Sequence, residues 1–391
     1  MKSTYRTSEA GRDLLSWRSE FPILDETVYL VNNSLGAMPR GVHEDLELFA
    51  DTWARRGVRA WQEGWWEIAV TTGDLLSPIL GVPTGTVAMH QNVTVAVGLF
   101  LSALDYPSGR NRIVSTELNF PSLLYLAYGE QEKGARINLV PSDDGIGIPT
   151  ERLLAEIDDH TRLVMISHTL FRSAFVQDAA AVARRCREVG ALLLLDVYQS
   201  AGAVPLALMD WGVDAAVGGS VKWLCGGPGA AYLWVRPDLA SRLRPRFTGW
   251  QADRAPFSFH SGPLEPADGA WRFLTGTPNV PALHSCRSGY RIIAEVGVDR
   301  IRQRSLSLTA KLIEDAERAG FEVRTPRVAD RRGGTVSVWH PEAERLAQVL
   351  IDQEIICDYR PGAGVRLSPH FYNSEEECDR AIDALRGAAG S

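Results

Sequence analysis

Short apolar runs and amphipathic segments alternate along the middle of the chain. Six runs are rich in apolar residues on both faces, which is typical of strands buried inside a sheet. They cover residues 112–116, 136–141, 162–168, 191–196, 215–219 and 230–235. Helical patterns lie between several of them, at residues 150–160 and 177–190, and the second ends on Gly190, as helices commonly do. This alternation predicts an α/β fold with a mostly parallel sheet between helices and with ligands at the carboxyl ends of the strands.

The pattern changes after about residue 285. A long helical run covers residues 291–320, and shorter strand-like and helix-like segments follow at residues 335–340, 343–355, 365–372 and 375–385. We therefore expect a large domain over residues 31–285 and a smaller α+β domain over residues 286–391. We expect the N-terminal segment, residues 1–30, to pack with the small domain.

Composition and charge exclude several kinds of partner. Of 391 residues, 45% are hydrophobic and 23% are charged, as in ordinary globular chains. The net charge is −7 and no basic run occurs, which argues against nucleic acid, because phosphate backbones are bound by clustered Lys and Arg. The N-terminus lacks the apolar core of a signal peptide, and no apolar stretch reaches the roughly 20 residues that span a bilayer. We therefore expect a cytoplasmic protein that binds no membrane.

Cysteines and histidines do not form metal-binding patterns. No C-x-x-C pair is present, which argues against a disulfide framework and a thiolate metal site. The histidines show no H-E-x-x-H or H-x-H spacing. We therefore expect no metal site and reduced, structural cysteines at positions Cys186, Cys225, Cys286, Cys357 and Cys378.

A single lysine, Lys222, lies among small, apolar and glycine residues, one predicted strand after Asp196. Apolar surroundings disfavour the ammonium form, and a neutral lysine amine can attack an aldehyde. An aspartate on the preceding strand can keep a pyridine nitrogen protonated, so Lys222 and Asp196 together have the groups that pyridoxal phosphate chemistry requires. The alternative on spacing alone is a surface lysine beside a glycine-rich turn and an aspartate that caps a helix.

Three further segments fit the same cofactor. Gln91, Asn92 and Thr94 precede or begin an apolar helix, whose N-terminal N–H groups can hold a phosphate, although an ordinary helix cap is the commoner use. Phe120 stands before a proline where an aromatic ring can stack on a cofactor or simply belong to the core. Arg366 has the planar fork that suits a carboxylate, or it forms an ordinary ion pair.

The order of these segments resembles the class V aminotransferase group of fold-type I pyridoxal phosphate enzymes, and within it the kynureninase-like branch. The resemblance covers nearly the whole chain. Among the segments that carry it are VYLVNNSLGAMPR, HQNVTVAVGL, ELNFPSLLY, SHTLFRSAFVQD, LLLLDVYQSAGAVPLALMDWGVD, SVKWLCGGPGAAYLWV, FTGW, FLTGTPNVPAL and VRLSPHFYNSEEE. It implies a large domain with a seven-stranded-type sheet and pyridoxal 5′-phosphate as the cofactor.

The resemblance also implies a role for each matching residue. Lys222 would carry the cofactor covalently, and Asp196 would pair with its pyridine nitrogen. Trp250 and Thr277 match positions that reach the phosphate from the other subunit, which implies a homodimer with active sites at the interface. The other implied cofactor contacts are Val93 and Thr94 for the phosphate, Phe120 for the ring, Gln199 for the phenolic oxygen, and Ser220. The implied substrate contacts are Asn33, Ser34 and, for the α-carboxylate, Arg366.

Departures from the family pattern bear on the reaction. Kynureninases have an aspartate, a histidine and a tyrosine where this chain has Leu123, Gln199 and Val221, so hydrolytic cleavage of kynurenine is not expected. Gln199 resembles the cysteine desulfurases, but the matching loop, residues 328–339, contains no cysteine. Cys357 follows an apolar run and fits a core position.

With kynureninase and cysteine desulfurase activity set aside, the resemblance predicts an enzyme that acts on a bulky amino acid. Trp65 belongs to a tryptophan-rich segment, residues 53–68, which either packs into the core or lines the substrate cleft. The first hypothesis is a lyase that cleaves a bond at Cβ, for example the C–S bond of a cysteine conjugate, or that decarboxylates the substrate and then deaminates it. The alternatives are a class V transaminase and a non-catalytic protein that keeps the fold.

Overall fold

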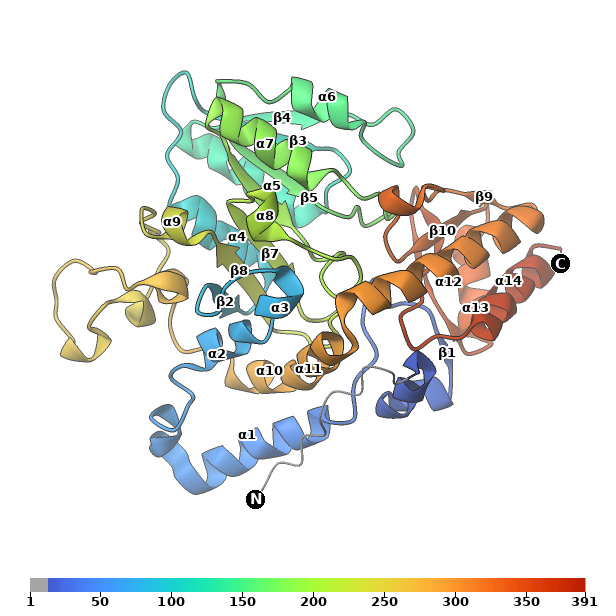
Figure 1. Ribbon diagram of the computed structural model, residues 1–391, viewed down its shortest axis with the longest axis horizontal. Coiled ribbons are helices and arrows are strands. Elements are labelled where there is room, and N and C mark those ends of the chain that lie inside the picture. The colour runs from blue at the N-terminus through green and yellow to red at the C-terminus, as the bar shows by residue number, and fades with distance from the viewer. Residues whose placement is uncertain (1–12, 391) are drawn as a thin grey trace.

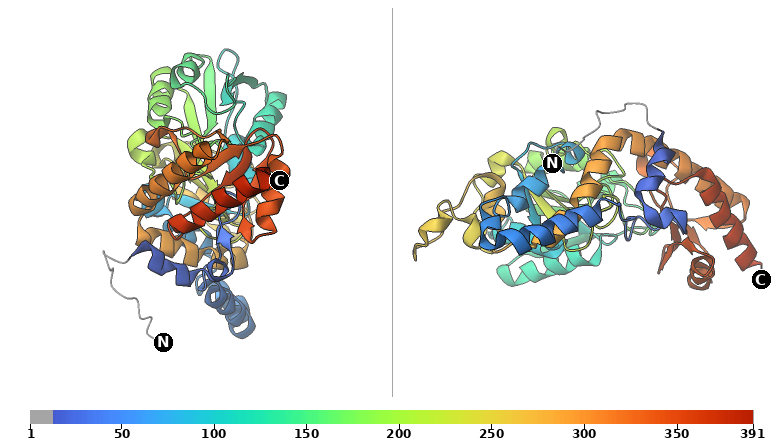
Figure 2. Two further views of the ribbon diagram at one scale, coloured as in Figure 1. Left: turned by 90° about the vertical axis from the view of Figure 1, so that its right-hand side faces the viewer. Right: turned by 90° about the horizontal axis from the view of Figure 1, so that it is seen from below.

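The computed structural model describes residues 13–390. Figure 1 shows two lobes side by side, a larger one that holds the main sheet and a smaller one that contains the C-terminus. Figure 2 shows that helix α12 runs from one lobe into the other. Among the described residues, no helix is both long enough and apolar enough to cross a membrane.

The larger lobe is built on a seven-stranded sheet in the order β2-β8-β7-β6-β5-β3-β4. Only β8 runs antiparallel to its neighbours β7 and β2. The predicted mostly parallel sheet flanked by helices is therefore confirmed. The strands are β2 Val87–His90, β3 Arg112–Thr116, β4 Arg136–Val140, β5 Thr161–Ser167, β6 Leu192–Asp196, β7 Ala215–Gly219 and β8 Ala231–Val235.

Three of the described α-helices, α4, α7 and α14, begin at a residue whose side chain caps the helix. In α7, the Asp178 side chain accepts a hydrogen bond from Ala181 N, and Gly190 ends the helix in the left-handed conformation with φ 70°. The α-helices are α1 Val42–Arg56, α2 Ile68–Asp74, α3 Ser77–Leu80, α4 Val93–Ser102, α5 Pro121–Gly129, α6 Thr150–Ala155, α7 Ala179–Val189, α8 Leu208–Trp211, α9 Pro237–Ala240, α10 Val280–Ser285, α11 Arg287–Val296, α12 Val298–Arg318, α13 Ala343–Ile351 and α14 Glu375–Ala389. Short 3-10 helices cover Leu14–Glu20, Pro22–Asp25, Gly57–Trp61, Glu130–Lys133, Trp250–Ala252, Pro256–Ser258, Gly269–Phe273 and Ala329–Arg331.

The smaller lobe contains an antiparallel sheet in the order β12-β13-β10-β9, on which α12 and α13 pack, and α14 packs on these two helices. The helical run expected over residues 291–320 is divided at Gly297, whose φ of 84° favours glycine and separates α11 from α12. The strands are β9 Glu322–Val323, β10 Val336–Trp339, β12 Asp358–Arg360 and β13 Gly364–Leu367.

The described part of the N-terminal segment contacts both lobes. Strand β1, Val28–Tyr29, pairs in parallel with β11, Ile355–Ile356, and Arg18 forms a 3.0 Å ion pair with Glu377 of α14. Phe21 belongs to the hydrophobic core of the larger lobe. The two cores divide within α12, later than residue 285, so the expected domain limits stay a prediction, and residues 1–12 of the expected segment lie outside the described residues.

Candidate active site

A cavity of about 230 Å³ lies at the carboxyl edge of the large sheet. Residues from the ends of β5, β6 and β7 and from the starts of α4 and α5 converge there, as expected for an open α/β sheet. The lining residues are Asn92, Val93, Thr94, Phe120, Ser122, Leu123, Ser167, Thr169, Phe171, Asp196, Tyr198, Gln199 and Lys222. The cavity thus joins six of the residues singled out from the sequence as cofactor contacts.

Lys222 points into this cavity from the loop after β7. Its Nζ lies 4.5 Å from the centroid of the Tyr198 ring and 5.7 Å from that of Phe120. Burial lowers the pKa of Lys222 to about 8, against the opposing attraction of Asp196. Gly36 packs directly on this loop: its N–H donates to Val221 O at 2.7 Å, and a Cβ there would lie 2.1 Å from the carbonyl oxygen of Lys222. The lysine amine therefore loses its proton more readily than an exposed lysine, and it extends from a tightly packed loop.

Asp196 ends β6, where it lies opposite Ser167 of β5. Its Oδ1 accepts a hydrogen bond from Tyr198 N at 2.9 Å, and its Oδ2 accepts one from Ser167 Oγ at 3.0 Å. Burial raises the pKa of Asp196, against the hydrogen bonds from Tyr198 and Ser167 and the attraction of Lys222. A buried carboxylate beside a protonated pyridine nitrogen would be stabilised by that charge, so the surroundings of Asp196 fit the cofactor.

The start of α4 forms a candidate phosphate site. Asn92 is the N-cap, and its side chain accepts a hydrogen bond from Val95 N at 3.0 Å. Val93 and Thr94 line the cavity and belong to the first turn of α4. The N–H groups of a first turn have no acceptor within the helix. The helix N-terminus therefore offers N–H groups and a positive dipole end to an anion.

Phe120 and Leu123 line the cavity from the start of α5. Phe120 is 44% exposed, and its ring lies edge-on to Phe171 with the centroids 5.3 Å apart. An exposed aromatic ring beside the lysine amine is free to stack on a planar cofactor. Leu123 is buried and contributes only apolar surface.

Gln199 and Asn33 form a hydrogen-bonded pair beside the lysine. The Gln199 Nε2 donates to the main-chain oxygen of Asn33 at 2.9 Å, and its Oε1 accepts from Trp223 Nε1 at 2.8 Å. The Asn33 side chain, with its amide oriented to satisfy its neighbours, donates to Ser368 Oγ at 2.8 Å and places its oxygen 3.0 Å from Arg366 Nη2. Ser34 is not part of the cavity wall, and its N–H donates to Val31 O.

Arg366 is buried next to the cavity on β13. Asp358 accepts from its Nε at 2.8 Å and from its Nη2 at 2.6 Å, while Phe171 O accepts from Nη1 at 2.5 Å. Arg366 is one of the charges that lower the pKa of Lys222. The guanidinium is thus near the lysine, and its orientation is determined by Asp358, the main-chain oxygen of Phe171 and the side-chain oxygen of Asn33.

Four other residues expected at the site lie outside this cavity. Ser220 is buried, its Oγ donates to Ala230 O at 2.9 Å, and it contacts the Tyr290 hydroxyl group. Trp65 packs on the large core, where its ring stacks on Phe49 with the centroids 5.5 Å apart. Its neighbour Trp66 is in a separate cavity of about 710 Å³, whose wall includes Trp250, Phe257 and Thr277. The expected contact of Trp65 with a bulky substrate stays a prediction, and so do the expected contacts of Trp250 and Thr277 with the phosphate of a partner subunit.

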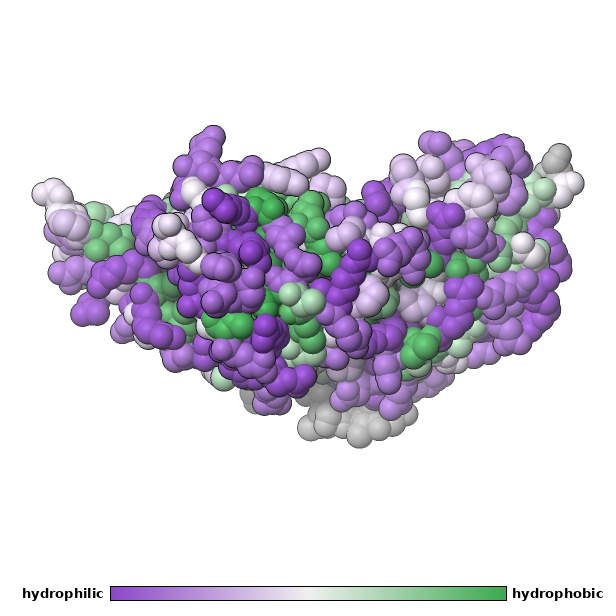
Figure 3. All heavy atoms as spheres, turned by 90° about the horizontal axis from the view of Figure 1, so that it is seen from above, coloured by the Kyte–Doolittle hydropathy of each residue, from purple (hydrophilic) through white to green (hydrophobic). Residues whose placement is uncertain are grey.

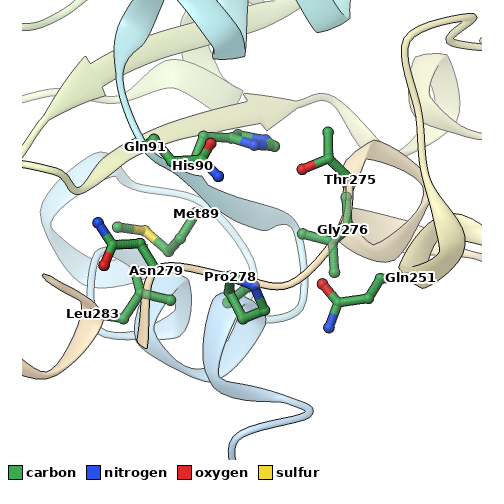
Figure 4. A pocket seen from close by; sticks show the side chains of 11 residues that line it. Met89, His90, Gln91, Gln251, Thr275, Gly276, Pro278, Asn279 and Leu283 are labelled. Carbon is green, nitrogen blue, oxygen red and sulfur yellow. The ribbon is translucent and has the colours of Figure 1, made fainter. Parts of the chain in front are cut away.

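Figure 4 shows where the loop that contains Thr275 and Gly276 meets the end of β2. Gln91 and His90 face Thr275 and Gly276 across a pocket of about 10 Å³, which has room for roughly one water molecule. Burial lowers the pKa of His90 to about 4, so its ring is neutral at physiological pH. Gly276, the residue before Thr277, therefore lies across this small pocket from Gln91, which directly precedes the N-cap of α4.

Some residues of the cavity were not singled out from the sequence. Tyr198 and Ser167 contact Asp196, and Phe171 and Thr169 complete the wall. A signal for Tyr198 is its place two residues after Asp196. Asp358 had no such signal, because its contact with Arg366 depends on the pairing of β12 with β13.

Comparison with known proteins agrees with this geometry. The profile of the aminotransferase class-V family matches residues 29–380. The chain belongs to the class V aminotransferase family. Kynureninase of Burkholderia pseudomallei (strain 1106a) is 32% identical over 377 residues, which cover 92% of this chain and 89% of the relative. Kynureninase of Pseudomonas fluorescens is 32% identical over 367 residues, which cover 90% of this chain and 86% of the relative.

Solved structures share the fold at lower identity. The apo cysteine desulfurase from Thermococcus onnurineus NA1 has a TM-score of 0.85 at 19% identity and covers 98% of this chain and 100% of its own. The cystine C–S lyase C-DES in complex with its product cysteine persulfide has a TM-score of 0.83 at 21% identity, and the match covers 94% of this chain and 99% of that one. As a kynureninase-like class V protein, the chain is a pyridoxal phosphate-dependent enzyme, and this prediction is confirmed.

Two other features of residues 13–390 bear on the chemistry. No group of three or more His, Cys, Asp and Glu side chains within these residues is arranged to hold a metal ion. All five cysteines are free and buried, and burial raises the pKa of each thiol to about 12. Inert thiols of this kind are typical of structural positions.

Proposed function

We propose that this class V enzyme cleaves a bond at Cβ of an α-amino acid with a bulky side chain, for example the C–S bond of an S-conjugated cysteine. The composition of the Lys222 cavity carries the proposal. Its wall contains one amine, Lys222, and one carboxyl group, Asp196, among hydroxyl, amide and apolar side chains, and it contains no cysteine. Lys222 is therefore the base placed to take a proton from Cα.

Asp196, the start of α4, Arg366 and Lys222 each have a part in such a reaction. Bound pyridoxal phosphate supplies an electron-withdrawing ring that acidifies the Cα–H bond of the substrate. Asp196 keeps the pyridine nitrogen protonated, and the start of α4 holds the phosphate. Arg366 binds the α-carboxylate and thereby orients Cα toward Lys222 Nζ.

The proposed cleavage balances without an oxidant. The Cα proton moves to Lys222 Nζ, and the electrons of the Cα–H bond form a double bond between Cα and Cβ. The Cβ–S bond breaks, its electron pair leaves with sulfur, and the sulfur takes a proton to give a thiol. The released 2-aminoacrylate then adds water to give pyruvate and ammonia. Lys222 serves as both acceptor and donor of the proton.

Two other reactions of relatives receive less support. A cysteine desulfurase needs a reactive thiolate, whereas the five thiols of this chain are buried and outside the cavity wall. A kynureninase is expected to carry polar groups at the positions of Leu123 and Val221, and Leu123 offers the cavity only an apolar surface. A class V transaminase remains the second candidate, because it needs the same lysine and arginine. Decarboxylation followed by deamination uses the same groups.

Product analysis separates these reactions. The holoenzyme is incubated with S-aryl and S-alkyl cysteine conjugates, and thiol, keto acid, ammonia and carbon dioxide are measured with and without an added keto acid. We expect thiol and pyruvate in equal amounts without a co-substrate. Product that forms only with a keto-acid co-substrate would establish a transaminase, and carbon dioxide would establish decarboxylation. Efficient release of anthranilate and alanine from kynurenine would contradict the proposal.

We also propose that the enzyme is a homodimer with active sites at the interface. Large apolar side chains are exposed around the second cavity, among them Trp250 at 43% and Phe257 at 61%. Exposed apolar groups gathered in one region are typical of a protein–protein interface. Figure 3 shows one face of the molecule, on which hydrophilic residues predominate and apolar residues form scattered patches.

A further inference from the structure

A buried hydrogen-bonded chain connects the residue after the lysine to the substrate loop. Trp223 follows Lys222 and is 1% exposed. Its indole Nε1 donates to Gln199 Oε1 at 2.8 Å, and Gln199 Nε2 donates to the main-chain oxygen of Asn33 at 2.9 Å. Three segments that are distant in sequence therefore meet at one amide group.

This arrangement determines which way the Gln199 amide points. An indole N–H can only donate a hydrogen bond, and a main-chain carbonyl can only accept one. The observed orientation satisfies both partners. The flipped orientation would place the amide NH₂ against the indole N–H and the amide oxygen against the Asn33 oxygen, and it would leave two buried groups unpaired.

The fixed amide has a consequence for the cofactor. Gln199 lines the Lys222 cavity, and its nitrogen carries a second hydrogen that Asn33 does not use. We propose that Trp223 is a positioning residue whose indole N–H holds the Gln199 amide with its nitrogen, not its oxygen, toward the phenolic oxygen of pyridoxal phosphate. An N–H in that place stabilises negative charge on the phenolic oxygen, whereas a carbonyl oxygen there would repel it.

Trp223 is itself held from both lobes. A Cβ on Gly334 would lie 2.6 Å from the indole ring, so glycine leaves the space that the ring fills. His370 Nε2 donates to Trp223 O at 2.9 Å, and its Nδ1 accepts from Phe371 N at 2.9 Å, so the ring proton is on Nε2. Burial lowers the pKa of His370 to about 4, which keeps this ring neutral. The indole therefore has one well-defined position.

The test is a pH titration of the holoenzyme, followed by the absorbance of its bound cofactor. The measured quantity is the midpoint, the pH at which half of the Schiff base is deprotonated. Trp223→Phe removes the N–H and keeps an aromatic ring. Loss of a donor to the phenolic oxygen makes the deprotonated Schiff-base form less stable, so we expect the midpoint to rise by roughly 0.4 to 1 pH unit. Trp234→Phe is the matched control, because Trp234 is equally buried and its Nε1 has no hydrogen-bond partner among the described residues.

Additivity distinguishes positioning from a general structural effect. Gln199→Leu removes the donor itself and is expected to raise the midpoint at least as far as Trp223→Phe. If Trp223 acts through Gln199, the double variant Gln199→Leu/Trp223→Phe shows the same midpoint as Gln199→Leu alone. A midpoint in Trp223→Phe that equals that of Trp234→Phe, or fully additive shifts in the double variant, would overturn the proposal.

A second variant keeps the test decisive if Trp223→Phe does not fold. Gln199→Glu retains an oxygen for the Trp223 N–H but presents an oxygen, in place of an N–H, to the cofactor. We expect its midpoint to rise further than that of Gln199→Leu, because a negative group then faces the phenolic oxygen. An unchanged midpoint in Gln199→Glu would show that the amide nitrogen does not face the cofactor. None of these outcomes depends on which substrate bond is cleaved.

Discussion

Asp358 binds the side of the Arg366 guanidinium through two parallel hydrogen bonds, Nε to Oδ1 at 2.8 Å and Nη2 to Oδ2 at 2.6 Å. The two residues lie opposite each other on the paired strands β12 and β13. Phe171 O accepts a third hydrogen bond from Nη1. Asn33 also places its side-chain oxygen 3.0 Å from Nη2, so of the five N–H groups of the guanidinium we expect one, on Nη1, to remain for a substrate carboxylate.

Asp358→Asn should weaken the binding of amino-acid substrates by changing the orientation of Arg366. An amide can accept only one of the two hydrogen bonds and removes the opposing charge, so we expect KM to rise about 10-fold and kcat to change less. Steady-state kinetics of the variant measures both. Arg366→Ala should lose activity more severely, and undiminished turnover of that variant or of a carboxyl-esterified substrate would disprove the assignment of Arg366.

Lys222→Ala should abolish turnover and covalent attachment of the cofactor while the fold is retained. The reason is that no other amine lines the cavity. Borohydride reduction of the holoenzyme followed by peptide mapping identifies the modified lysine, and circular dichroism of the variant checks the fold. A label on any other lysine would contradict the assignment.

Attachment of pyridoxal phosphate to the cofactor-free protein should accelerate with pH up to about 8. Burial lowers the pKa of Lys222 from 10.5 to about 8, so its neutral fraction rises about tenfold per pH unit below 8 and levels off above it. The same shift makes the folded protein bind fewer protons than the unfolded chain between pH 8 and 10.5, so this group's contribution to stability improves as the pH rises through that range. Stopped-flow absorbance measures the rate, and an inflection near 10.5 would show that the amine is not desolvated.

Asp196→Asn should lower kcat by about 100-fold or more while the cofactor remains bound. A neutral amide no longer stabilises the protonated pyridine nitrogen, although its oxygen can still accept from Tyr198 N and its NH₂ group can donate to Ser167 Oγ. Absorbance of the purified variant reports cofactor content, and assays at saturating substrate report kcat. A near-normal kcat would mean that Asp196 has only a structural part.

Mixed dimers should show that Trp250 serves the active site of the partner subunit. Lys222→Ala and Trp250→Ala are each expected to be impaired alone. In a 1:1 mixture, about half of the dimers are mixed, and each mixed dimer has one intact site, so about one quarter of wild-type activity should return. Light scattering checks that the protein is a dimer. A fully active monomer, or no gain on mixing, would be evidence against the proposed interface.

The pattern of apolar residues predicts most of the sheet in the larger lobe. The six apolar runs became strands β3 to β8, and Gly190 ends α7 as expected. Burial of a strand on both faces and the capping of a helix are local properties, which the order of apolar, polar and glycine residues specifies directly. Strand β2 is only four residues long and gave no clear pattern of its own. Placing Asp196 and Lys222 at the carboxyl edge of the sheet followed from the same rule, since parallel strands end at one edge.

The tertiary structure alone decided which side chains meet. The sequence indicated a tryptophan-rich segment over residues 53–68 but could not show that Trp65 packs on Phe49 while Trp66 lines a separate cavity. Likewise, the hydrogen bond from Trp223 to Gln199 joins residues 24 positions apart, on loops that follow two different strands. Such contacts depend on the pairing and packing of whole elements. A change in strand register or helix position would separate these groups without altering the local pattern that produced each element.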